Sequence, residues 1–164
     1  MHGVQIRIDF DCVRNRRESL VILTNDRKEW KAELSNVHYY YTENMEVDSI
    51  SREVINAIPK SKWINFINKL FDLKILTIED NYKIPNFEYY MPTDGCGIAI
   101  EIATKNMYRF YNYDNPGRYE KKYWQAGNVI AIQNLLYDEF DILKTWDRQR
   151  EEARLIYVAE KESK

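Results

Sequence analysis

Two aspartates near the N-terminus have a spacing that could serve catalysis or metal binding. Asp9 and Asp11 are two positions apart in a segment that alternates apolar and polar residues, so both carboxylates are expected on one face of a strand. Glu101, in a later strand-like segment, is expected on a facing strand of the same sheet. Such a cluster could bind a divalent cation or act as an acid/base pair. Alternating charges on the solvent face of a strand explain the aspartates without any function, and this interpretation is favoured.

Glu101 interrupts an apolar segment in which Ala99 and Ala103 are its neighbours on the same face. A buried carboxylate needs a partner that donates a hydrogen bond or carries a positive charge. Arg109, on the next predicted strand, is the obvious partner, so a structural ion pair between Glu101 and Arg109 is favoured. The alternative is a pocket around the same two residues, in a small enzyme or a ligand-binding domain.

The remaining reactive residues match no catalytic, cofactor-binding or metal-binding motif. Nucleophilic catalysis needs a base beside the nucleophile, and the two histidines, His2 and His38, are expected at a terminus and on a partly exposed strand. Cys12 and Cys96 indicate neither a zinc site nor a disulfide framework, although they could pair in an oxidising compartment. The glycine-containing segment 94–97 precedes a strand rather than a helix, so it is not a phosphate loop. No catalytic residue, no metal and no cofactor is predicted.

Tyrosine is the one unusual feature of the composition, with 13 residues in a chain of 164. Most of them are concentrated between residues 82 and 123. Tyrosine suits a surface that is wet when free and dry when bound, because it offers a large area, little entropy to lose and a hydroxyl group. Packing of these side chains between the sheet, the helix at 119–140 and the proline-rich loop is the other interpretation, and it is slightly favoured. The candidate binding residues are Tyr89, Tyr90, Tyr108, Tyr111 and Tyr113, with Glu101 and Arg109.

The sequence alone does not determine a function. The hypothesis that fits it best is a non-enzymatic protein-binding domain, of the immunity or adaptor type, whose tyrosine-rich hairpin binds another protein. A net charge of −2, from 24 basic and 26 acidic residues, gives no positive field for a phosphate backbone, so no nucleic-acid partner is expected. The oligomeric state stays open.

The elements that position these residues follow from hydrophobic periodicity. Strict alternation over residues 4–11, an apolar run at 20–23 and a β-prone segment at 30–42 predict a three-stranded antiparallel meander. The run at 20–23 is apolar throughout, which predicts a strand covered on both faces. Two further segments, 98–103 and 107–113, predict a later hairpin.

Helices are expected between and after these strands. Ile50, Val54 and Ile58 recur at a spacing of four and predict a short helix that ends at Pro59, and a second short helix follows. The pattern over residues 119–140 predicts a longer amphipathic helix. The fold class is therefore α+β, an antiparallel sheet of about five strands, namely a three-stranded meander plus a later hairpin, with helices packed on one face.

The length and composition fit one domain. Residues 1–142 are expected to form a single α+β domain, and residues 143–164 a charged C-terminal helix or tail. No apolar run approaches the ~18 residues of a membrane span, and the N-terminus lacks a signal-peptide pattern, so no membrane partner is expected. A cytoplasmic location is predicted, although a leader removed earlier would leave no trace. The segment 101–116 resembles small bacterial proteins of unknown function, and this resemblance implies no activity.

Overall fold

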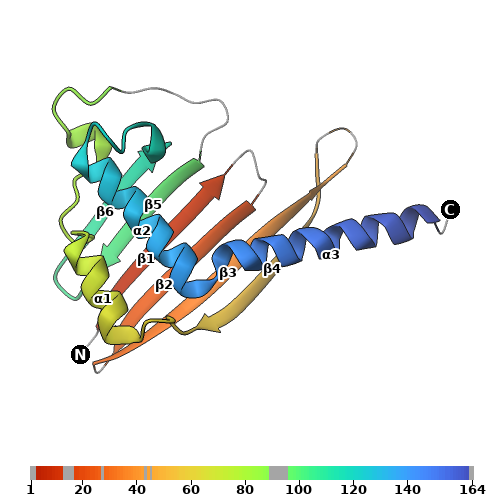
Figure 1. The fold of residues 1–164 in the computed structure, drawn as a ribbon, viewed down its shortest axis with the longest axis horizontal. Helices are drawn as coiled ribbons and strands as arrows, with labels where there is room; N and C mark the ends of the chain where they lie inside the picture. The colour runs from red at the N-terminus through yellow and green to blue at the C-terminus, as the bar shows by residue number, and fades with distance from the viewer. Residues whose placement is uncertain are drawn as a thin grey trace.

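The computed structural model describes residues 3–12, 17–26, 28–42, 44, 46–88 and 96–162. Within them, one antiparallel sheet packs against three α-helices that cross the same face of the sheet (Figure 1). The strands are β1 (Val4–Cys12), β2 (Arg17–Asp26), β3 (Glu29–Tyr41), β4 (Val47–Ala57), β5 (Cys96–Ala103) and β6 (Tyr108–Asp114). The helices are α1 (Trp63–Asp72), α2 (Trp124–Phe140) and α3 (Ile142–Glu162), with short 3-10 turns η2 (Asn81–Lys83) and η3 (Pro116–Arg118). The predicted α+β class is confirmed.

The strand order is β4-β3-β2-β1-β5-β6, and every neighbouring pair is antiparallel. The first four strands form a meander, and the β5–β6 hairpin adds to its other edge through β1. Pairing of β1 with β5 puts Ile8 opposite Ile100. The N-terminal strand is therefore in the middle of the sheet, where its side chains have neighbours on both sides.

The predicted number of about five strands is too low: the described residues form a sheet of six, because residues 47–57 form β4 and not a helix. Ile50 and Val54 are four positions apart, which suits a helix but also places both side chains on one face of a strand, since four is an even number. The adjacent β-branched pair Val54 and Ile55 favours the strand. β4 pairs with β3 along its length and forms one edge of the sheet.

The core lies between the sheet and the helices. On β1 the alternation places Ile6, Ile8 and Phe10 on the helix side, where all three are fully buried. Phe66 of α1 and Phe140 of α2 meet over the sheet with ring centroids 5.2 Å apart. Other core residues are Val21, Leu23, Leu34, Leu70, Ile98, Ile100, Ile102, Val129, Ile132 and Leu136. These two helices therefore bury one face of the sheet.

The other face of the sheet carries no helix from residues that the structure describes, and we call it the open face. The prediction that residues 20–23 are covered on both sides is wrong. Val21 and Leu23 are fully buried on the helix side, whereas Leu20 and Ile22 are half-buried on the open face. The central strand β2 is thus apolar on both faces, although the described part of the chain covers only one.

Helix α3 continues from α2 after Asp141, which adopts a left-handed conformation with φ of 52°. Its first turns pack on the helix side of the sheet, where Ile142 and Trp146 are buried. Farther along, Arg148 of α3 donates to Glu53 of β4 at 2.7 Å. The helix then extends past the sheet toward the C-terminus (Figure 1). No helix in the described residues is long and apolar enough to cross a membrane.

Candidate functional site

Tyr111 and Tyr113, two of the predicted surface residues, are core residues. Each side chain is 1% exposed. The Tyr111 hydroxyl donates to the carbonyl oxygen of Ile75 at 2.8 Å, and the Tyr113 hydroxyl donates to that of Glu79 at 2.6 Å. Burial raises the pKa of both hydroxyls. The expectation that they form a binding surface is wrong, because the odd-numbered positions of β6 face the segment that precedes β5.

The open face of the same strand carries Tyr108 and Phe110 instead. Tyr108 is 66% exposed and Phe110 is 50% exposed. Tyr108 was a predicted binding residue, but Phe110 was not, although its alternation with Tyr111 along the strand could have indicated it. Tyr89 and Tyr90, also predicted to bind, lie outside the described residues.

Glu101 and Arg109 lie on opposite faces of the β5–β6 hairpin. On the open face, Glu101 accepts a hydrogen bond from Arg7 of β1 at 3.0 Å and one from the Tyr108 hydroxyl at 3.4 Å. On the helix side, Arg109 donates to the carbonyl oxygen of Ile78 at 2.8 Å. The predicted ion pair between Glu101 and Arg109 is therefore wrong, because neighbouring strands place residues 101 and 110, rather than 101 and 109, in register. The two side chains cannot line one pocket.

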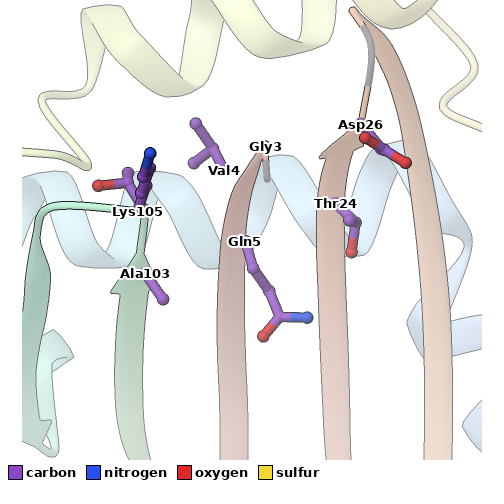
Figure 2. A pocket seen from close by; sticks show the side chains of 8 residues that line it. Gly3, Val4, Gln5, Thr24, Asp26, Ala103 and Lys105 are labelled. Atoms are coloured by element: carbon purple, nitrogen blue, oxygen red, sulfur yellow. The ribbon is translucent and has the colours of Figure 1, made fainter. Parts of the chain in front are cut away.

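The pocket shown in Figure 2 lies at the ends of β1, β2 and β5. Its volume is about 520 Å³, and its lining includes Gln5, Thr24, Asp26 and Lys105. Neither Glu101 nor Arg109 lines it. The prediction of a pocket around those two residues thus gains no support from this pocket.

Four carboxylates lie near one another on the open face, and we call them the acidic cluster: Asp9, Asp11, Glu18 and Glu101. Asp11 lies directly opposite Glu18 in the β1–β2 register. Glu101 lies opposite Arg7, the neighbour of Asp9 on the same face of β1. Asp9, Asp11 and Glu101 were predicted to share one sheet, whereas Glu18 was not predicted because the strand that carries it begins earlier than its apolar run.

Asp9 has the most unusual environment in the acidic cluster. Its Oδ1 atom is buried and accepts no hydrogen bond from the described residues. Burial, followed by repulsion from Glu18 and Asp11, raises the pKa of the Asp9 carboxyl to about 6, and the positive charge of Arg7 offsets only part of this rise. The same two causes, burial and then Glu18, raise the pKa of Asp11. A proton or an external cation would relieve the charge on Asp9.

Glu18 and Glu101 already have donors. The Tyr39 hydroxyl donates to Glu18 at 2.8 Å, and this bond is the main reason that the pKa of Tyr39 rises to about 12. Arg7 donates to Glu101. Among the described residues, no group of three or more His, Cys, Asp or Glu side chains is arranged to hold a metal ion.

Cys96 is disulfide-bonded, and the other cysteine of the chain, Cys12, stands opposite it in the β1–β5 register. The sequence indicated no disulfide framework, because the two residues are far apart along the chain and meet only through the pairing of these strands. Stable disulfides are rare in reducing compartments. The disulfide is thus at odds with the cytoplasmic location, which stays a prediction.

No protein-family model, no curated protein and no solved structure matches this chain.

Proposed function

We propose that this protein is a non-enzymatic protein-binding domain whose partner covers the open face of the sheet. The observation that carries the proposal is the group of apolar side chains on that face, which the described part of the chain does not cover. Half-buried Leu20 and Ile22 lie at its centre, and exposed Phe110 and Tyr108 lie on its β6 edge. On the β4 side, Val54 is 48% exposed.

An antiparallel sheet with one solvated face normally has polar residues on that face. Here the register aligns Val54, Ser35 and Leu20 in one row across β4, β3 and β2. The row continues to Asp9 and Ala99 on β1 and β5. Apolar side chains that lie beside charged ones on an exposed surface are typical of protein-interaction sites. The immunity or adaptor type of binding protein fits this surface, with the binding residues moved from the predicted tyrosine-rich hairpin to the open face.

The test compares two phenylalanines of similar exposure on opposite sides of the molecule. Phe110 is 50% exposed on the open face, and Phe71 is 43% exposed on α1. Partners captured from native cell extract with the wild-type protein are identified, purified and titrated by calorimetry. Phe110→Ser should weaken binding about tenfold or more, as expected for an aromatic anchor, whereas Phe71→Ser should not.

Circular dichroism confirms that both variants are folded before binding is measured. Absence of any captured protein, or a larger loss with Phe71→Ser than with Phe110→Ser, would overturn the proposal. In either case the helix side or another region would have to provide the function.

A further inference from the structure

Resting on the proposed function, we propose that the protein surface which covers the open face is basic, and that one of its arginine or lysine side chains pairs with Asp9. The first argument is charge. The acidic cluster contains four carboxylates, and Arg7 is the one basic residue directly in register with a member of the cluster. The whole chain has a net charge of only −2, so the concentration is local. A basic surface is electrostatically complementary to it.

The second argument is the unequal distribution of donors within the acidic cluster. Glu101 accepts from Arg7 and Tyr108, and Glu18 accepts from Tyr39. Asp9 has a buried oxygen that no described group satisfies. Asp9 is only half-buried as a whole and has no donor for its buried oxygen, so an external donor to its carboxylate contributes more than one to a fully solvated carboxylate.

The third argument is the space beside Asp9. The register places Ala99 next to Asp9 and Gly97 next to Asp11, both on the open face of β5. A Cβ atom built on Gly97 would meet nothing closer than 3.8 Å, the distance to Oδ1 of Asp114. On the far side of this row of small residues stands Asn112 of β6. A long basic side chain lying over Ala99 would therefore have the Asp9 carboxylate on one side of its charged end and the Asn112 side chain on the other.

The apolar residues around the acidic cluster indicate a protein rather than a small cation. Leu20 lies beside Asp9 on β2, and Phe110 lies beside Glu101 on β6. A metal ion or a polyamine would leave these side chains uncovered. A protein surface that carries both basic and apolar side chains would match both features of the open face.

The test compares binding by a variant that lacks two negative charges on the open face with binding by a control variant that lacks two negative charges on the helices. The variant is Asp9→Asn with Asp11→Asn, and the control is Asp72→Asn with Asp147→Asn, two exposed aspartates on α1 and α3. Three probes are used: a synthetic peptide of repeated Arg-Ala-Gly, its Glu-Ala-Gly counterpart, and the partner identified by capture. Binding of the two peptides is followed by NMR of the ¹⁵N-labelled protein.

The arginine peptide should shift the amide signals around Asp9 and Ala99, and the glutamate peptide should not. Both the peptide and the partner should bind the Asp9/Asp11 variant about tenfold or more weakly, and the control variant as the wild type. Binding of the partner should also weaken as salt is raised.

Peptide shifts confined to another region, or no peptide shifts at all, would overturn the inference. It is also overturned if the partner binds the Asp9/Asp11 variant as tightly as the wild type. If Phe110→Ser still abolishes that binding, the proposed function survives and only the basic partner is rejected; if Phe110→Ser has no effect either, both are rejected.

Discussion

Asp11 on β1 and Glu18 on β2 lie directly opposite each other in the sheet, so two carboxylates face one another on the open face. Like charges in directly opposed positions destabilise a sheet. Their repulsion also reaches Asp9, whose pKa they raise. Residues that lower the stability of a free domain are typical of functional surfaces, which agrees with the proposal that a partner covers this face.

Asp9→Asn should stabilise the protein at neutral pH. The pKa of the Asp9 carboxyl is about 6 in the folded protein, against its ordinary value of 3.8. The folded state therefore holds the proton more tightly than the unfolded state, and stability is lost as the pH rises through this window. The free energy of unfolding of the variant, relative to that of the wild type, should therefore rise by on the order of 1 kcal/mol between about pH 4 and pH 7, after allowance for solvent screening.

Urea denaturation at several pH values measures this difference, with Asp72→Asn as the control for the substitution itself. A difference between Asp9→Asn and the wild type that stays constant with pH, or that falls as pH rises, would contradict the environment assigned to Asp9.

Tyr111→Phe should destabilise the fold and leave partner binding unchanged. The lost hydroxyl donates to the carbonyl oxygen of Ile75 in the core, so its removal leaves a buried acceptor unpaired and costs about 1–2 kcal/mol. Tyr108→Phe is the matched variant on the open face, where stability should change by less than about 0.5 kcal/mol. Chemical denaturation and calorimetric titration give both quantities. Weakened binding by Tyr111→Phe at full stability would mean that the two faces are assigned the wrong way round.

Trp146→Phe should loosen the attachment of α3 to the sheet. The indole Nε1 of Trp146 donates to Oγ of Ser19 at 2.7 Å, and both residues are buried. Ser19 in turn donates to Asn36 on β3. The substitution should lower the free energy of unfolding by about 1–3 kcal/mol. A double-mutant cycle with Ser19→Ala should give a coupling of about 1 kcal/mol; no coupling would show that the bond does not form in solution.

Cys96→Ser should lower the stability by about 2–4 kcal/mol, because a cross-link between β1 and β5 closes a long loop in the unfolded chain. A reducing agent should lower the melting temperature of the wild type and leave that of the variant unchanged. Equal melting temperatures for the wild type with and without the agent would show that the disulfide does not form under the conditions used.

The sequence predicted the fold correctly where the hydrophobic periodicity fits only one type of secondary structure. Strict alternation over residues 4–11 identified β1 and the inward direction of Ile8, and the later hairpin was found in the same way. It failed at β4, where the spacing of four between Ile50 and Val54 suits both a helix and a strand, and only pairing with β3 decides between them.

The binding face could not be predicted from composition. Tyrosines on β6 are divided between two faces, and which face is covered depends on where the helices pack, which no local pattern contains. Tyr111 therefore lies in the core and Tyr108 on the surface. The acidic cluster likewise depends on strand register, which brings Asp11 and Glu18 together across the β1–β2 pair.

The most direct test of the open face as the binding surface is methyl NMR of the protein with and without its captured partner. The open face carries methyl groups of Leu20 and Ile22, whereas Ile8 and Leu23 place theirs in the core. We predict large shifts for Leu20 and Ile22 and small shifts for Ile8 and Leu23. Unchanged signals from Leu20 and Ile22, with shifts confined to residues of the helices, would contradict the central claim.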